Sequence, residues 1–289
     1  YVEHVLDMLG GRDLSGIKIV LDTANGAGSA VGPDVLRASG AEVIVIANEP
    51  DGRNINAGCG ATHPEFVAAA VVEHGADMGV ALDGDADRLI AVDHTGTVVD
   101  GDHIIAICAA DLRARGQLAN DTVVVTVMTN LGFRLAMEAA GIHVVETGVG
   151  DRYVLEALGA GGHSLGGEQS GHVIFADHAT TGDGLLTAVA LIDIVKRSGT
   201  TLEAIASEAM TSLPQVLVNV RVGERVPDVA VRLADEIATV EAALGATGRV
   251  LVRASGTEPL IRVMVEAATA ERAHDAADQL AAAARSRFG

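Results

Sequence analysis

Three aspartates stand at alternate positions in one short stretch of the chain. Asp83, Asp85 and Asp87 follow an apolar run at residues 78–82, and Arg88 comes next. Like charges this close repel one another, so a cation bound among them would stabilise the stretch. Carboxylate oxygens without histidine or cysteine are typical ligands of Mg²⁺, and Ca²⁺ and Mn²⁺ match less well. The spacing therefore predicts a magnesium site formed by these three carboxylates.

Other interpretations of this acidic stretch are weaker. An EF-hand loop starting at Asp83 needs glycine at its sixth position and glutamate at its twelfth, where this chain has Arg88 and His94. A haloacid-dehalogenase-type phosphatase also has Asp-x-Asp after a strand, but its fifth position is normally Thr or Val, and here it is Asp87. A solvated acidic turn seldom gathers three carboxylates at the end of an apolar strand. We therefore retain the metal site.

A glycine-rich stretch at residues 166–172 gathers a carboxylate, an amide, a hydroxyl and an imidazole. These belong to Glu168, Gln169, Ser170 and His172. Glycines let the backbone approach a ligand closely. Such mixed donors and acceptors match the vicinal hydroxyls of a sugar, which both give and accept hydrogen bonds. Spacing alone leaves a tight turn with a surface histidine as an equal alternative to a sugar-binding loop.

A third polar stretch lies between two apolar runs near the end of the chain. It contains Ser255, Gly256 and Thr257, with Arg253 before them and Arg262 after them. Hydroxyls, backbone N–H groups around a glycine and two guanidinium groups can together bind a phosphate. The stretch is not a Walker loop, because the lysine is missing and a strand is expected to follow. The alternative is an ordinary hairpin with surface arginines, but in so acidic a chain the arginines favour phosphate.

The composition excludes several classes of partner. The chain has 289 residues and a formal net charge of −19, whereas nucleic acid and anionic membranes require a basic surface. No stretch long enough to span a bilayer is free of charges, and no signal sequence opens the chain. Cys59 and Cys108 lack metal-site spacing and are expected to be free buried thiols. We expect a cytoplasmic protein that binds neither nucleic acid nor membranes.

The periodicity of the chain predicts alternating strands and helices as far as residue 212. Strands are expected at residues 17–21, 42–46, 78–82, 89–92, 97–99, 122–127, 143–145 and 164–166. Helices are expected at residues 32–39, 64–73, 102–115, 131–140, 153–158 and 185–196. Strands separated by helices predict mainly parallel sheets. In the stretch before the last of these helices, Thr181 or Asp183 is most simply a helix cap.

The chain after Pro214 has a different pattern. Strands are expected at residues 216–222, 249–253 and 260–265, and helices at residues 229–244 and 270–285. Two adjacent strands joined by a short loop are typical of an α+β domain. The predicted fold is therefore α/β, with two consecutive α/β domains at residues 1–99 and 100–212 and a smaller α+β domain at residues 213–289.

The three polar stretches, in this order, resemble the motifs of the α-D-phosphohexomutase family across essentially the whole chain. They read DGDADR, GEQSGH and SGTEP. The family has four domains around a deep cleft, with a serine that is phosphorylated in the first domain and one such motif in each of the others. This sequence has no Thr-Ala-Ser-His-Asn-like serine loop. The resemblance implies that the chain matches the last three domains and is inactive alone.

Other stretches are similar to the subgroup of the family that acts on amino sugars. They are Gln169 itself and residues 50–62 and 149–154. The implied reaction converts glucosamine 6-phosphate to glucosamine 1-phosphate through a phosphoserine enzyme and a bisphosphate intermediate. It would lie on the route to UDP-N-acetylglucosamine and peptidoglycan. A mutase specific for mannose or glucose phosphates is the nearest alternative.

The resemblance also implies roles for individual residues. The three aspartates would hold Mg²⁺ together with an oxygen of the phosphoserine, and the ion would withdraw charge from the transferring phosphoryl group. Arg88, Asp151 and Arg152 would take part in catalysis. The residues expected to bind the sugar and the phosphate that is not transferred are Glu168, Gln169, Ser170, His172, Arg253, Ser255, Gly256, Thr257 and Arg262.

Functions of other classes remain as alternatives. A non-catalytic sugar-phosphate-binding protein would keep the sugar and phosphate stretches, but it has little need of three aspartates. A magnesium-dependent phosphatase would release inorganic phosphate from sugar phosphates. The identity of the general acid and base stays open, and so does the formation of a homodimer.

Overall fold

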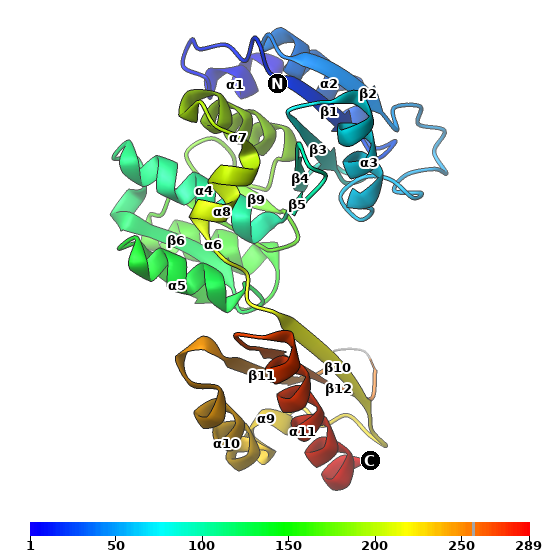
Figure 1. The fold of residues 1–289 in the computed structure, drawn as a ribbon, viewed down its shortest axis with the longest axis vertical. Helices are drawn as coiled ribbons and strands as arrows, with labels where there is room; N and C mark the ends of the chain where they lie inside the picture. Colours follow the sequence, from blue (N-terminus) through cyan, green and yellow to red (C-terminus); the bar gives the residue numbers. More distant parts are fainter. Residues whose placement is uncertain (256–257) are drawn as a thin grey trace. The chain divides into compact units, whose positions relative to one another are not determined.

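The structure is a computed structural model that describes all residues except 256 and 257 (Figure 1). By its internal contacts the chain forms two compact units. The first contains Tyr1–Thr129 and Phe133–Thr211, and the second contains Asn130–Gly132 and Ser212–Gly289. Because both predicted α/β domains lie in the first unit, the boundary expected between them at residue 99 stays a prediction.

The first sheet of the first unit has the strand order β2-β1-β3-β4-β5. The parallel strands are β2 (Glu42–Ile46), β1 (Lys18–Asp22) and β3 (Met78–Leu82), and β4 (Leu89–Asp93) and β5 (Val98–Val99) are antiparallel. Every residue of β3 is buried, as expected for a parallel strand covered on both faces. Because β3 ends at Leu82, the acidic stretch emerges at the carboxyl edge of the sheet, where α/β folds bind their ligands.

The second sheet of the first unit has the strand order β7-β6-β8-β9. Its parallel strands are β7 (His143–Thr147), β6 (Thr122–Thr126) and β8 (Leu165–Gly167), and β9 (Val173–Phe175) is antiparallel to β8. Strand β9, which follows the glycine-rich stretch directly, was not predicted. The glycine-rich stretch is therefore the turn that joins β8 to β9.

The helices along this part of the chain pack on both sheets and join them. They are α1 (Val2–Asp7), α2 (Gly28–Ala38), α3 (Pro64–His74), α4 (Gly101–Ala114), η1 (Ala119–Asp121), α5 (Leu131–Ala139), α6 (Asp151–Gly161), α7 (Gly184–Ser198) and α8 (Leu202–Ala209). Helix α7 contacts α1, α2, β3 and β4 as well as α4 and β9 (Figure 1). One core of buried side chains thus extends across both sheets, and it fixes the loops at their edges.

The second unit is a small antiparallel sheet in the order β10-β12-β11 with helices packed on it. Its elements are β10 (Gln215–Arg221), α9 (Val229–Arg232), α10 (Ala234–Leu244), η2 (Gly245–Thr247), β11 (Arg249–Ala254), β12 (Leu260–Glu266) and α11 (Ala270–Phe288). The single helix predicted at residues 229–244 is wrong. The backbone of Leu233 leaves the helical region at φ −109° and ψ 19°, and its side chain is fully buried in the core of this unit.

Residues 130–132 belong to the second unit because their polar groups bond to it. The Asn130 side chain accepts a hydrogen bond from the N–H of Leu213 (2.9 Å) and donates one to its carbonyl oxygen (3.0 Å). Oε2 of the buried Glu266 accepts the N–H of Leu131 at 3.0 Å. The start of α5 is thus satisfied by a carboxylate that lies far away in the sequence.

Two expectations from composition can be compared with the described residues. Cys59 and Cys108 are free and buried, as predicted. Over the part of the chain that the structure describes, none of the helices combines the length and the apolar surface needed to cross a membrane.

Candidate active site

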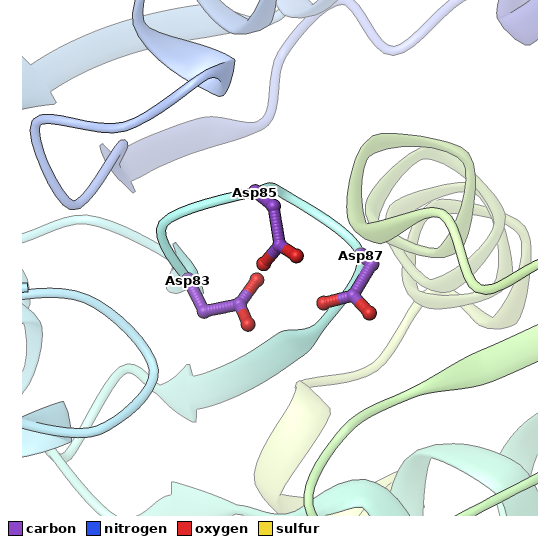
Figure 2. A group of neighbouring side chains, drawn as sticks. All are labelled: Asp83, Asp85 and Asp87. Atoms are coloured by element: carbon purple, nitrogen blue, oxygen red, sulfur yellow. The ribbon is translucent and has the colours of Figure 1, made fainter. Parts of the chain in front are cut away.

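The three predicted metal ligands lie together at the end of β3. Figure 2 shows the carboxylates of Asp83, Asp85 and Asp87 pointing toward one another across the loop. One oxygen from each residue lies within 4.8 Å of the others. Asp83 is buried, Asp87 is half-buried and Asp85 is exposed. One small cation can therefore be shared by the three side chains while it is reached from solvent.

The electrostatics of Asp83 favour a bound cation. Burial, followed by the charge of Asp87 and its hydrogen bond to Asp83, raises the pKa of the Asp83 carboxyl to about 7. The N–H of Arg88, which donates to Asp83 Oδ1 at 3.2 Å, lowers this pKa in part. A raised pKa means that the carboxylate form is destabilised where it stands. A divalent cation at this point would remove that cost.

Unsatisfied polar atoms in the loop also fit a cation. Among the described residues, Oδ1 of Asp87 and Nε of Arg88 are buried without a hydrogen-bond partner. Arg88 Nε lies 3.6 Å from Asp83 Oδ2 and 3.8 Å from Asp87 Oδ1, which is ion-pair range but too long for a hydrogen bond. Asp87 thus keeps an oxygen for a ligand, and an all-oxygen donor set suits Mg²⁺.

Close backbone contacts hold residues 83–88, here called the metal loop, in place. The carbonyl oxygen of Gly84 accepts the N–H of Ala27 at 2.9 Å, and a Cβ on Gly26 would lie only 2.4 Å from that oxygen. At the other end of the loop, Ala86 adopts φ 62° and its carbonyl oxygen accepts the N–H of Gly184 at 2.9 Å. The loop is therefore fixed by the residue that precedes α2 and by the first residue of α7.

The structure brings the glycine-rich stretch at residues 166–172, here called the sugar loop, next to the metal loop. The carbonyl oxygen of Gly171 accepts the N–H of Leu89 (3.0 Å), the first residue of β4. The N–H of Gly101 donates to the carbonyl oxygen of Gln169 at 3.1 Å. A Cβ on Gly101 would lie 2.2 Å from the carbonyl oxygen of Glu168. The backbone of the glycine-rich turn is thus joined to the start of β4 and to the start of α4.

The side chains of the sugar loop point to different neighbours. Glu168 Oε1 accepts the N–H of Gly150 at 3.1 Å, just before α6. The Gln169 amide donates to Asp100 Oδ2 at 3.4 Å, and Asp100 caps the first turn of α4. Ser170 is exposed. Substrate contact by Glu168, Gln169 and Ser170 stays a prediction.

Asp151 and Arg152 form the first turn of α6, beside Gly150. The Arg152 side chain is 80% exposed and pairs with Glu156 at 2.7 Å. Because Glu168 binds the N–H of Gly150, this turn lies next to the sugar loop. The catalytic roles of Asp151 and Arg152 stay predictions.

His172 is enclosed, unlike the exposed Ser170 two residues earlier. Only 2% of its surface is exposed, and its Nε2 accepts the N–H of Gly182 at 3.1 Å. Asp183 caps α7 by accepting the N–H groups of Leu185 and Leu186, which confirms one of the two caps proposed for that stretch. Direct contact of His172 with a sugar stays a prediction.

The predicted phosphate stretch lies in the second unit, between β11 and β12. Arg253 and Arg262 stand directly opposite each other in the antiparallel pair, and both are half-buried. Neither guanidinium has an ion-pair partner in the described part of the chain. Ser255 is buried, and its N–H donates to Leu260 O at 2.8 Å. The other two predicted contacts, Gly256 and Thr257, lie outside the described residues.

Sequence reasoning missed two acidic residues that support the loops. Asp22 is fully buried, which raises its pKa, and its oxygens accept the N–H groups of Ala24 (2.8 Å) and Gly60 (2.7 Å). Asp100 holds Gln169, as described above. The sequence contains a signal from which Asp22 could have been predicted, because Asp22 ends an apolar strand at the same sheet edge as Asp83. For Asp100 the only such signal is its position just before a predicted helix.

Family models match nearly the whole chain. The phosphoglucomutase/phosphomannomutase alpha/beta/alpha domain II matches residues 1–96, alpha/beta/alpha domain III residues 100–213, and the C-terminal domain residues 217–283. These three matches contain the metal loop, the sugar loop and the paired arginines, respectively.

Curated relatives with the same name are similar over the full chain. A phosphoglucosamine mutase of Streptomyces avermitilis is 57% identical over 296 residues, which cover 100% of this chain and 64% of the relative. One of a Nocardioides species is 60% identical over 288 residues, covering 97% of this chain and 62% of the relative. The chain thus spans somewhat less than two thirds of the length of these relatives.

Solved structures share the fold. A crystal structure of Aspergillus fumigatus N-acetylphosphoglucosamine mutase in complex with GlcNAc-6P and magnesium superposes with a TM-score of 0.80 at 22% identity. It is matched over 100% of this chain and 65% of that one. Because the matches to the domain models and the curated relatives agree along the chain, this protein belongs to the phosphoglucomutase/phosphomannomutase family.

Proposed function

We propose that this chain supplies the metal-, sugar- and phosphate-binding parts of a phosphoglucosamine mutase, which converts glucosamine 6-phosphate to glucosamine 1-phosphate. The observation that carries the proposal is the clustering of Asp83, Asp85 and Asp87 beside the glycine-rich turn within one compact unit. The name shared by relatives at 55–60% identity supports the amino-sugar substrate. The phosphoserine would be supplied by sequence that this chain does not contain.

Each group of residues would have a separate task in the reaction. Bound Mg²⁺ would neutralise charge on the phosphoryl group that is transferred. Arg88, which lies within 3.8 Å of two of the aspartates, would add a positive charge at the edge of the same site. Glu168 and Ser170 would accept and donate hydrogen bonds to sugar hydroxyls.

The paired arginines of the second unit would bind the phosphate that is not transferred. Two like charges directly opposite in a sheet destabilise it, and a phosphate dianion between Arg253 and Arg262 would remove that repulsion. Binding at a point separate from the metal would let a bisphosphate intermediate bind in either orientation. A cytoplasmic location and a homodimer are further parts of the proposal.

An assay with sugar phosphates tests the proposed function. The 289-residue chain should bind Mn²⁺ and glucosamine 6-phosphate but should not isomerise it, whereas the complete protein should. Glucosamine, glucose and mannose phosphates should be compared on the complete protein, because preference for a hexose would favour the phosphoglucomutase or phosphomannomutase alternative. Release of inorganic phosphate by the chain alone would instead indicate a phosphatase. Isomerisation by the chain alone would contradict the need for a serine from outside it.

A further inference from the structure

Tyr1 and Asp183 are hydrogen-bonded to each other although 182 positions separate them in the sequence. The phenol O–H of Tyr1 donates to the Asp183 carboxylate, and its oxygen lies 2.8 Å from Oδ1 and 2.9 Å from Oδ2. Partial burial of the phenol, followed by this hydrogen bond, raises the pKa of Tyr1 above its ordinary value. The phenol therefore keeps its proton at neutral pH and remains a donor to a charged group, which makes the hydrogen bond a strong one.

Helix α1 and the residues that follow it place this phenol. Tyr1 immediately precedes α1, and Val5 of that helix is fully buried in the core of the first unit. After α1, the Arg12 guanidinium donates two hydrogen bonds of 2.9 Å to Asp193 of α7. This part of the chain is thus attached to α7 at two points, at Asp183 just before the helix and at Asp193 further along it.

Asp183 lies between two glycines that touch the metal loop. The N–H of Gly184 donates to the carbonyl oxygen of Ala86 at 2.9 Å. On the other side, a Cβ on Gly182 would lie only 2.6 Å from the carbonyl oxygen of Asp87. The backbone on both sides of Asp183 therefore packs directly against the half of the metal loop that carries Asp87.

Two different sets of donors hold the Asp183 carboxylate. Its Oδ1 accepts two backbone N–H groups at the start of α7, each at 3.0 Å. This cap fixes Asp183 to its own helix, whereas the Tyr1 phenol fixes it to another element. Tyr1, Asp183, Asp85 and Asp87 also line one cavity of about 350 Å³. The phenol thus lies beside the predicted metal ligands without belonging to them.

We propose that Tyr1 is a positioning residue that holds the start of α7 through Asp183 and so keeps the Asp87 half of the metal loop in the shape that binds a divalent cation. The inference rests on the proposed function only in taking the three aspartates of the metal loop as a cation site. Tyr1 contacts neither the cation nor the substrate in this role. Without its hydroxyl, only the helix cap would fix Asp183, and the glycines beside it would be free to shift away from the loop.

Mn²⁺ affinity, measured by electron paramagnetic resonance on the 289-residue chain, tests this role without any turnover. Tyr1→Phe removes only the hydroxyl and should weaken binding by roughly 10-fold, the lower end of the effect of residues that orient metal ligands, because Tyr1 acts through Asp183. Tyr153→Phe is the matched control and should leave the affinity unchanged. Tyr153 is the other tyrosine of the chain, and its exposed fraction is similar, 52% against 56% for Tyr1.

Asp183→Ser tests whether the effect passes through the carboxylate. Serine is a good N-cap, so the start of α7 is kept, but the carboxylate that the phenol binds is removed. Asp183→Ser should weaken Mn²⁺ binding by roughly 10-fold, and adding Tyr1→Phe to it should cause no further loss, because the two side chains act through one contact. Circular dichroism and thermal unfolding would establish that each variant is folded.

Amide hydrogen exchange tests the step between Tyr1 and the metal loop. In the metal-free chain, the Gly184 N–H should exchange faster in Tyr1→Phe than in wild type, because its hydrogen bond to Ala86 opens more often. Nuclear magnetic resonance measures this exchange. A change in overall stability alone would not alter Mn²⁺ affinity and the exchange of this amide together in a folded variant.

The possible outcomes separate this inference from the proposed function. Wild-type affinity or unchanged Gly184 exchange in folded Tyr1→Phe would overturn it, and so would an equal loss in Tyr153→Phe or a further loss in the double variant. Failure of Tyr1→Phe to fold would show a structural role and overturn it as well. If a variant with Asp183→Ser does not fold, loss of affinity with faster exchange in Tyr1→Phe and neither in Tyr153→Phe supports the inference, and any other combination overturns it.

Two further results bear on the proposed function alone. Failure of wild type to bind Mn²⁺ would refute the metal site itself. Preference of the complete protein for another sugar phosphate would refute only the proposed substrate.

Discussion

The acidic loop of the first unit and the paired arginines of the second unit both place like charges side by side, but different contacts hold them there. The aspartates stand in a loop that is locked by backbone approaches at glycines, such as Gly26 against Gly84. Arg253 and Arg262 are held by the register of two antiparallel strands. Adding one methyl group at such a glycine should therefore disrupt the acidic loop. The pair of strands that carries Arg253 and Arg262 should tolerate changes to these side chains.

In both regions the repulsion is a cost that a bound ligand would remove. For the acidic loop it is visible as the raised pKa of Asp83. For the arginines it follows from their opposition across the β11–β12 pair. Functional sites commonly keep unfavourable local arrangements of this kind, because the surrounding fold compensates for them.

The largest effect should come from removing charge in the acidic loop. Asp83→Asn combined with Asp87→Asn should weaken Mn²⁺ binding by at least about 100-fold, because two of the three charged oxygen donors are lost. The measurement is a titration followed by electron paramagnetic resonance. Asp235→Asn, an exposed change in α10, should leave affinity unchanged. Full binding by the double variant would show that the cluster is not the metal site.

Adding one methyl group to a glycine tests whether backbone contact holds the loops. Gly171→Ala should destabilise the chain by about 2–3 kcal/mol, because its Cβ would lie 2.2 Å from the carbonyl oxygen of Leu89 and its φ is +94°. Urea unfolding followed by circular dichroism measures this. Gly223→Ala in the second unit, where a Cβ meets nothing within 4 Å, is the control. Equal stability of both variants would remove the contrast between the two regions.

Replacing one arginine should separate binding from stability in the second unit. Arg253→Gln should weaken binding of inorganic phosphate by roughly 10-fold, through loss of one charge-assisted contact. It should also stabilise the unit by about 0.5 kcal/mol, because the repulsion from Arg262 is removed. Calorimetric titration and thermal unfolding measure the two effects. A variant that loses both binding and stability would indicate that the arginines support the fold and not a ligand.

The last prediction is a pH dependence of stability in the chain without metal. The pKa of Asp83, about 7 in the folded protein, lies above its value in the unfolded chain. The folded state therefore binds the proton more tightly, and the stabilisation from this group is lost as pH rises from about 4 to about 7. Thermal unfolding across this range should show a steeper fall for wild type than for Asp83→Asn. An identical fall in the two proteins would contradict the raised pKa.

Much of the fold could be predicted from local patterns. Apolar runs gave β2 and β3 at their observed bounds. For β3, the reason is that a fully buried parallel strand needs apolar residues on both faces. Strand β9 and the break at Leu233 were not predicted. The three residues of β9 carry no period, and the break at Leu233 depends on a core that only the folded unit provides.

For the candidate site, residue type and spacing alone determined which groups belong to it. Three aspartates at alternate positions after a buried strand must share one loop, so their proximity follows from local geometry. Only the tertiary structure decided what surrounds them. It enclosed His172 against Asp87, joined Gln169 to Asp100 and placed Arg253 opposite Arg262. Such contacts depend on how segments far apart in the chain pack, and no local pattern of residues records that.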